Sequence, residues 1–413
     1  MTNKYFDMKD TVYDVIERYK EAKDLLVSLG FTTIEKEVQK KAIAKSINLE
    51  TALKSKKINP DTFEERLIDL IENNLVEDVT SGVKENKEKS DVKILGVLPC
   101  PVKNPLLEEL NKWYKNKEDS ITIDYELKPA SMGVDWLKKD IQNGQSAEDL
   151  SDIFMSAGFD LFFDKKLMGK FKKVNVFKDF TGYKEYNKDF NNDYINLKDP
   201  DEEYSILGVV PAVFLVNKDE LGNRKMPRSW KDILDGDFEN SVSLPIGDFD
   251  LFNAILLNIY KTYGREGVQN LGRSMKKALH PSQMVKEGGR KADDQPAITI
   301  MPYFFTRMAK RFPHMEFVWP EDGAIVSPIF MLTKKEKNDQ MQPLIDLMAS
   351  EKMGKILAEQ GLFPSVLPEV DNGLPKDAQF MWPGWDFLRG ENPGVLLKDL
   401  EAEFNKAVEV VAV

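Results

Sequence analysis

Cysteine and histidine are nearly absent from this chain, which has one Cys and two His among its 413 residues. The single cysteine, Cys100, forms no internal disulfide and leaves no CxxC or cysteine–histidine cluster for structural zinc. The histidines, His280 and His314, each lie beside a proline, which favours an ordinary loop position over a metal-ligand role. The sequence therefore gives no support to a zinc-stabilised fold or a histidine-rich metal site.

Several catalytic signatures are missing as well. No GxGxxG follows a predicted strand, and GxxxxGK[ST], GxSxG and HExxH do not occur, so dinucleotide, P-loop, hydrolase and zinc-protease sites have no support. Positive charge is in deficit, with a formal net charge of −11, whereas a nucleic-acid partner requires a basic face. We predict no nucleic-acid partner and no resident cofactor; a metal or metal chelate enters only as a bound ligand.

Long apolar runs are missing too. The N-terminus, MTNKYFDMKDTVYDVIERY, has no continuous apolar segment of the kind that marks a secretory signal peptide. No window reaches about 18 uncharged apolar residues, the length that spans a membrane. The sequence therefore predicts a cytoplasmic protein that does not span a membrane; an extracytoplasmic location would require a signal that had been trimmed. Hydrophobic residues still make up 42% of the chain, enough for packed cores.

Residues 1–78 predict a small helical domain. Apolar residues recur at helical spacing in TVYDVIERYKEAKDLLVSLGF, and EKEVQKKAIAKSI predicts a second amphipathic helix. A third helix follows Asn48, a predicted N-cap, and a fourth begins at Asn59-Pro60-Asp61. Residues 79–91 are charged, with few apolar side chains, and predict a flexible linker.

From Val92 onward, predicted strands alternate with helices. The strand VKILGVL precedes a helix over residues 106–114, and VSLPIG precedes a helix over residues 251–263. Alternation of this kind is typical of α/β units with largely parallel sheets. The remaining expected strands are SITIDYEL, DIFMSAGFDLFF, YSILGVVPAVFLVNK, PAITIMPYFF and GAIVSPIFMLTK.

Three segments of this region resemble the solute-binding proteins of ABC transporters. Residues 207–247 contain a long apolar strand, the PRSWKDIL helix and the VSLPIG strand in the order and spacing of that family. Residues 323–364 contain a return strand and a helix pair ending in GLFP, and residues 92–114 form the first βα unit. Within the family, the chain looks closest to the iron(III)- and polyamine-binding branch.

The resemblance implies an α/β fold of the two-lobed type II periplasmic-binding-protein kind, with a separate all-α N-terminal domain. Lobe one would comprise residues 92–205 and 325–375, and lobe two residues 206–324 and 376–413. Hinged lobes leave a cleft at the carboxyl ends of strands, where a ligand bridges both sides and stabilises the closed state.

The resemblance also implies which residues line the cleft. They lie in the loop after the first strand, at strand ends near glycines, before a helix, at the position of a tyrosine pair in the iron-binding branch, and on the return strand. The predicted ligand-binding residues are Pro99, Cys100, Lys103, Asn104, Ser131, Ser156, Asp248, Tyr303 and Ser327.

Structural roles are open alternatives for several of these residues. Two prolines around Cys100 can shape a rigid turn, and the serines can serve turn chemistry. Asp248 or Asp250 can equally be a helix N-cap. Phe304 and Phe305 stand beside Tyr303, so the tyrosine pair is not intact, and packing is the expected use of both phenylalanines. Core packing is likewise expected for the aromatic segment FMWPGWDFLRGENP.

Residues 5–75 resemble a small domain at the N-terminus of iron–sulfur cluster repair and hemerythrin-like proteins. That family carries a Cys-x-x-Cys pair after a Gly-Phe or Gly-Leu turn, whereas this chain has Thr32 and Thr33 in GFTTIEKE. The sequence therefore supports no redox or metal role here and leaves protein–protein contact or self-association through residues 1–78.

Two functions stay open. The first is a ligand-binding protein that closes two lobes on a small ligand, anionic or a metal chelate, and the missing catalytic signatures favour it. The alternative is a cytosolic enzyme on the same fold, with Cys100 as nucleophile or cofactor ligand and Lys103 or an Asp as base. A weaker interpretation makes the lobes a scaffold assembled through the helical domain.

Overall fold

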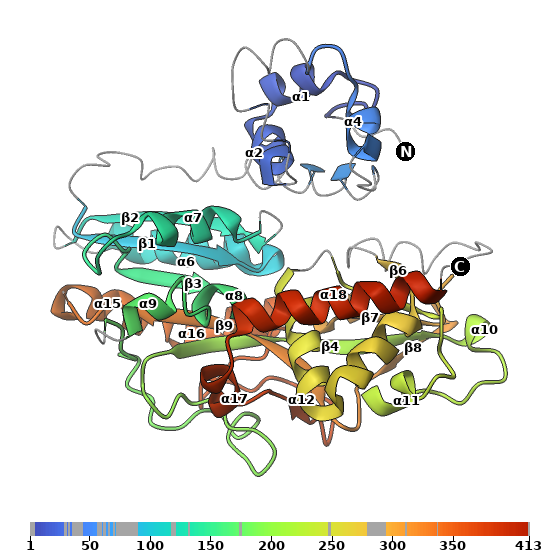
Figure 1. Cartoon of the computed structure of the whole chain (residues 1–413). Helices are drawn as coiled ribbons and strands as arrows, with labels where there is room; N and C mark the ends of the chain where they lie inside the picture. The colour runs from blue at the N-terminus through green and yellow to red at the C-terminus, as the bar shows by residue number, and fades with distance from the viewer. Residues whose placement is uncertain are drawn as a thin grey trace. The chain divides into compact units, whose positions relative to one another are not determined.

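The computed structural model divides the chain into two compact units (Figure 1). The first contains residues 1–88 and 128–136, and the second contains residues 89–127 and 137–413. The residues that the structure describes are 5–28, 31, 34, 44–55, 60, 63–64, 67–68, 71, 90–116, 121–130, 133–172, 176–246, 249–278, 295–309, 312–336 and 338–411.

The first unit is helical, as the sequence predicts. Helix α1 (Val12–Arg18) begins at Thr11, whose side chain accepts a hydrogen bond from the Asp14 backbone N–H. The extended backbone of Tyr19 separates α1 from α2 (Lys20–Ser28), so the first predicted helix is two helices.

Helix α4 (Leu49–Ser55) confirms the predicted N-cap, because Asn48 Oδ1 accepts from the Thr51 N–H at 2.8 Å. Residues 35–43 of the predicted second helix and most of the linker lie outside the described residues, and residues 44–46 form a turn. This unit has its own apolar core, which includes Val15, Leu25, Leu26, Leu49, Leu53, Phe63 and Leu67.

The described part of the second unit is built on one ten-stranded sheet. Its strand order is β2-β1-β3-β9-β4-β7-β5-β6, with β10 paired to β9 and β8 paired to β4. The strands are β1 (Val92–Leu98), β2 (Ile123–Pro129), β3 (Ile153–Ser156), β4 (Ser205–Asn217), β5 (Val242–Leu244), β6 (Met275–Ala278), β7 (Ile298–Pro302), β8 (Met315–Val318), β9 (Ala324–Thr333) and β10 (Phe380–Met381).

Two long strands, β4 and β9, cross the middle of this sheet. They pair antiparallel with each other, whereas β1 pairs parallel with β3, and β5 pairs parallel with both β6 and β7. The sheet therefore has a first half (β2, β1, β3) and a second half (β7, β5, β6), joined by β9 and β4. Every residue of β9 is buried, which explains its continuous apolar sequence.

Helices cover both faces of the sheet (Figure 1). Those after residue 90 are α6 (Cys100–Asn116), α7 (Asp135–Asn143), α8 (Phe159–Phe162), α9 (Gly169–Lys172), α10 (Lys218–Leu221), α11 (Trp230–Leu234), α12 (Phe249–Ser274), the 3₁₀ helix η3 (Tyr303–Phe305), α14 (Thr306–Ala309), α15 (Asn338–Met348), α16 (Glu351–Lys355), the π-helix η4 (Ile356–Gln360), α17 (Trp385–Gly390) and α18 (Pro393–Val411).

The segment that carries the family resemblance folds as predicted. Ser229 caps α11 and forms a capping box with Asp232, and the Trp230 ring packs edge-on against Phe214 of β4 with centroids 4.9 Å apart. Helix α12 packs against α18, where the ring centroids of Phe252 and Phe404 lie 5.1 Å apart. The aromatic segment at 380–393 also packs inside, since Phe380 and Trp385 are buried.

Several predicted element boundaries are wrong. Helix α6 begins at Cys100 rather than Leu106, because a proline suits the first turn of a helix and Pro101 occupies it. The expected strand DIFMSAGFDLFF stops at Ser156, since Gly158 adopts φ 144° and α8 follows. Helix α12 extends to Ser274 beyond a break at Gly264. Short strands β6, β8 and β10 were not expected.

Candidate functional site

Ser327 lies at the centre of the two crossover strands. It is on β9, directly opposite Val210 on β4. The side chain is 1% exposed, and its Oγ has no hydrogen-bond partner within the described part of the protein. A buried hydroxyl without a partner is costly, by about 1–3 kcal/mol, and such groups occur where a ligand supplies the partner or where strain is tolerated. Ser327 is therefore the strongest site candidate among the predicted residues.

The face of the sheet to which Ser327 points follows from strand alternation. Successive side chains project to opposite faces, so Ser327, Ile329 and Met331 share one face. Ile329 and Met331 belong to the core cluster that α6, α15, α16 and η4 cover. Val210 and Phe304, both partly buried, pack against the same cluster. Ser327 thus adjoins a mostly apolar face between the two halves of the sheet.

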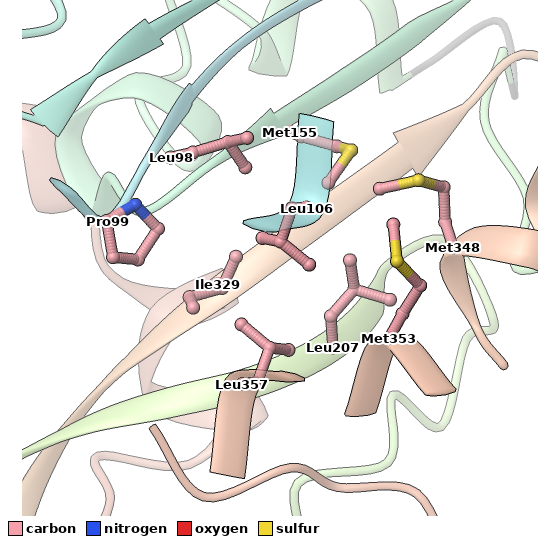
Figure 2. A pocket seen from close by; sticks show the side chains of 9 residues that line it. All are labelled: Leu98, Pro99, Leu106, Met155, Leu207, Ile329, Met348, Met353 and Leu357. Atoms are coloured by element: carbon pink, nitrogen blue, oxygen red, sulfur yellow. The ribbon is translucent and has the colours of Figure 1, made fainter. Parts of the chain in front are cut away.

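Pro99 lies on this face as well. It lines a small cavity of about 10 Å³ with side chains from β1, α6, β3, β4, β9 and the helices α15, α16 and η4 (Figure 2). An apolar space of this size holds at most about one water molecule and normally stays dry. We interpret it as a gap in core packing and not as a ligand pocket. Its lining residues are Leu98, Pro99, Leu106, Met155, Leu207, Ile329, Met348, Met353 and Leu357.

Tyr303 begins η3, directly after β7. Its ring centroid lies 5.8 Å from that of Phe317 and 5.2 Å from that of Trp319, in a partly exposed aromatic group. Burial raises the pKa of Tyr303 above its ordinary value of 10.0. The phenol therefore stays protonated at neutral pH and can donate a hydrogen bond. The next residue, Phe304, packs on Phe305, as predicted.

Ser156 lies on the other face of the sheet. It is opposite Phe330 on β9, and Phe330 is three positions from Ser327, so the two serines project in opposite directions. Ser156 is buried, and its Oγ donates to the Ala157 carbonyl at 2.5 Å. The structure therefore does not bring Ser156 together with Ser327.

Of the residues predicted to form a loop after β1, Cys100, Lys103 and Asn104 lie instead in the first turns of α6, and Pro99 directly precedes the helix. Lys103 is 1% exposed, and its backbone N–H donates to the Pro99 carbonyl at 3.0 Å. Asn104 is half-buried. Cys100 begins the helix, but its side chain lies outside the described part, as do Ser131, Asp248 and His280.

Sequence reasoning missed two contacts that link the halves. Asp250, near the start of α12, accepts a hydrogen bond from the Phe159 backbone N–H at 3.0 Å. Arg307 on α14 donates to the backbone carbonyl of Gln360 at 2.9 Å and to that of Glu359. Neither contact has a local sequence signal, because the partners are about 50 to 90 positions apart.

A second surface depression, of about 330 Å³, lies beside α11 and α12. Asp235, Glu239, Glu266 and Arg273 are among its lining residues. Its buried hydroxyl, Ser274, donates to the Leu271 carbonyl, and its half-buried Arg273 is paired with Asn270 and Glu239. Among the described residues, no group of three or more His, Cys, Asp and Glu side chains is placed to hold a metal ion.

An α/β sheet in two halves joined by crossover strands is the arrangement expected from the resemblance to solute-binding proteins. Residues 148–391 match the family model described as bacterial extracellular solute-binding protein. The chain belongs to this family. Residues 6–63 match a second model, described as a domain of unknown function, DUF1858. No curated protein sequence matches the chain.

Solved structures of low sequence identity share the fold. The ferric binding protein from Campylobacter jejuni is 11% identical, with a TM-score of 0.53 over 77% of this chain and 99% of that one. The Trichodesmium protein IdiA (FutA), in complex with iron and citrate ligands, is 11% identical, with a TM-score of 0.54 over 76% and 98%.

A third similar structure holds a different kind of ligand. AfuA from Actinobacillus pleuropneumoniae, with exogenous fructose-6-phosphate bound, is 13% identical, with a TM-score of 0.51 over 79% of this chain and 100% of that one. The fold is therefore that of the type II periplasmic-binding proteins, and its structural neighbours include iron-binding proteins. Among the described helices, none has the length and apolar character to cross a membrane.

Proposed function

We propose that the second unit binds a small anionic solute or metal chelate by closing two lobes over the crossover strands. Residues 92–205 with 325–375 form one lobe of this proposal, and residues 206–324 with 376–413 form the other. The observation that carries it is the buried Oγ of Ser327, which has no hydrogen-bond partner among the described residues and lies where β4 and β9 join the halves. A bound solute would satisfy that hydroxyl in the closed state.

The printed ligands of the structural neighbours support the chemical class. Iron with citrate and fructose-6-phosphate both carry anionic oxygens. In this chain, the protonated phenol of Tyr303 and the hydroxyl of Ser327 are suitable donors to such oxygens. Phe304 in place of a second phenol argues for a chelate or organic anion over a bare ferric ion.

The test is a thermal-shift series on the full chain with Fe(III)–citrate, citrate and fructose-6-phosphate as probes. A ligand that binds only the native state raises the melting temperature, and we expect at least one probe to do so. Ser327→Ala should raise the dissociation constant of that probe by about threefold to tenfold, because one hydrogen bond to the probe is lost. If no probe raises the melting temperature, the proposed ligand class is wrong.

Ser243→Ala is the matched control. Ser243 on β5 is equally buried and its Oγ also has no partner in the described part, but it lies away from the crossover strands. It should leave the thermal shift unchanged. If both substitutions weaken binding of the probe equally, Ser327 is not part of the binding site.

We propose a cytoplasmic location for this activity. Cell fractionation with an antibody to the chain tests that location. For the first unit, of which residues 6–63 match the domain of unknown function DUF1858, we propose a role in protein contact or self-association. Light scattering of the full chain beside a chain lacking residues 1–78 would measure any self-association.

A further inference from the structure

A short segment after β7 reaches from the second half of the sheet to elements that cover the first half. Phe304 lies on η3 and Arg307 on α14. Their partners lie on and just after η4, which packs against α6. We call Phe304 and Arg307 the clasp.

Phe304 makes the apolar contact of the clasp. Its ring centroid lies 5.3 Å from that of Phe363, a residue that is 1% exposed. Phe304 also packs against the core cluster of the first half, which includes Leu98, Val102 and Leu357. A side chain carried by the second half therefore covers apolar surface of the first, and this contact is lost if the halves separate.

Arg307 makes the polar contact. Its guanidinium donates to the carbonyls of Glu359 and Gln360, at the C-terminal end of η4. The last carbonyls of a helix lack partners within the helix and carry partial negative charge. A cationic fork with several N–H donors matches two adjacent carbonyls. The contact thus satisfies groups that would otherwise need water.

The backbone that receives the clasp is tightly held. At Gly361, a Cβ would lie 2.3 Å from the Phe363 ring and 2.4 Å from Val102. Leu362 adopts a positive φ of 50°. The chain therefore turns sharply after η4 and presents the two carbonyls and the Phe363 ring at fixed positions, ready for Arg307 and Phe304.

We propose that the clasp closes the two lobes without ligand, so that the unliganded protein is largely closed. This inference rests on the proposed function, because it assumes that the halves move as lobes. Contacts made only in the closed state shift the population toward it. The clasp would then restrict ligand entry and slow ligand release, and it would set the fraction of protein open to solute.

The experiment measures the distance between lobes in the full chain without ligand. Spin labels are placed through unnatural amino acids at Glu108 on α6 and Lys231 on α11, both exposed, so that Cys100 stays intact. We expect a short distance in the native chain. Phe304→Ala with Arg307→Ala should add a longer population and lower the closed-to-open ratio by about tenfold. Arg307→Lys, which cannot span two carbonyls as a rigid fork, should give an intermediate ratio.

Arg265→Ala is the matched control. Arg265 is an exposed arginine that binds Glu403 at 2.8 Å, and both residues lie in the proposed lobe two. It should leave the distance unchanged. Identical distances in the native and clasp variants, with both folded by circular dichroism, would overturn the clasp.

The two proposals fail separately. If the clasp variant opens but no probe raises the melting temperature, the clasp proposal stands and the proposed ligand class is wrong. If a probe binds but the distance between the spin labels is the same in all variants, the binding function stands and the clasp proposal is wrong.

Discussion

The indole Nε1 of Trp230 donates a hydrogen bond to the carbonyl oxygen of Gly323 at 3.0 Å. Trp230 begins α11, and Gly323 directly precedes β9. Gly323 has φ 106°, and a Cβ there would lie 2.7 Å from the carbonyl carbon of Phe380. This junction ties α11 and β10 to the start of a crossover strand.

We expect Gly323→Ala to lower the free energy of unfolding by about 3 kcal/mol or more, because positive φ and steric clash both oppose a Cβ. Gly236→Ala is the control, since Gly236 has φ 93° and a Cβ there would meet no atom within 4 Å. It should cost about 1–2 kcal/mol. Urea unfolding measures both, and equal losses would show that φ alone sets the cost.

Removing the Ser327 hydroxyl should not destabilise the unliganded protein. Because Oγ is buried without a partner in the described part, Ser327→Ala should change the free energy of unfolding by less than about 0.5 kcal/mol or increase it. Ser205→Ala should lose about 1–3 kcal/mol, since the Ser205 Oγ donates to Asp179 at 2.7 Å and Asp179 is buried. If Ser327→Ala lowers the free energy of unfolding as much as Ser205→Ala does, the Ser327 hydroxyl already has a hydrogen-bond partner.

Asp199 is a buried acid that organises the turn before β4. It accepts hydrogen bonds from Arg389 at 2.5 Å and from the Glu203 and Tyr204 backbone N–H groups at 2.9 Å. Asp199→Ala should cost about 3–5 kcal/mol, because it breaks a buried ion pair. Asp201→Ala removes a second partner of Arg389 that is 59% exposed and should cost less than about 1 kcal/mol. Thermal and urea unfolding of the two variants compare them directly.

Asp322 predicts a pH dependence of stability. Burial raises the pKa of Asp322 above its ordinary 3.8, although the Trp230 N–H and the Tyr263 hydroxyl, at 3.1 Å from the carboxylate, lower it in part. Between 3.8 and the raised pKa the folded state binds more protons than the unfolded state, so the free energy of unfolding falls as pH rises.

Asp322→Asn should remove this fall from the curve of unfolding free energy against pH. Tyr263→Phe takes away a donor to the carboxylate, so it should raise the pKa of Asp322 further and extend the fall to higher pH. Urea unfolding at a series of pH values from about 4 to 7 measures the curves. A curve unchanged by Asp322→Asn would assign the pH dependence to other groups.

The reactivity of the Cys100 thiol distinguishes a solute-binding protein from the enzyme alternative. If the protein only binds solute, the alkylation rate of its single thiol should rise with a midpoint near the ordinary thiol pKa of about 8.5. A nucleophile would show a midpoint lowered by one or more units. Iodoacetamide labelling followed by mass spectrometry measures the rate, and a depressed midpoint would favour the enzyme.

Much of the fold could be predicted because its signals are local. The apolar strands that became β4 and β9 and the capped helix at Trp230 are recognisable within short windows. The site was harder, because the face to which a side chain points depends on strand register. Ser156 and Ser327 both follow plausible patterns, yet their pairing with Phe330 and Val210 sends them to opposite faces.

The helix start at Cys100 shows another limit of the sequence. Pro99, Pro101 and Pro105 suggest a loop, but Pro101 suits the first helical turn and α6 continues through Pro105. Lys103 is consequently buried on a helix and does not lie in an open loop. The clasp was not predictable for a different reason, since Arg307 meets backbone carbonyls, which carry no side-chain signature.

The turn after η4 also reaches the crossover strand β4. The Pro364 carbonyl accepts from the Val209 N–H at 2.9 Å, beside the register shift of β4 between Ile206 and Gly208. Residues 356–365 therefore touch the clasp at one end and an irregular point of the crossover pair at the other. If the halves move as the proposed lobes, a substitution in this stretch should change both the stability of the closed state and the irregular pairing of β4 with β9.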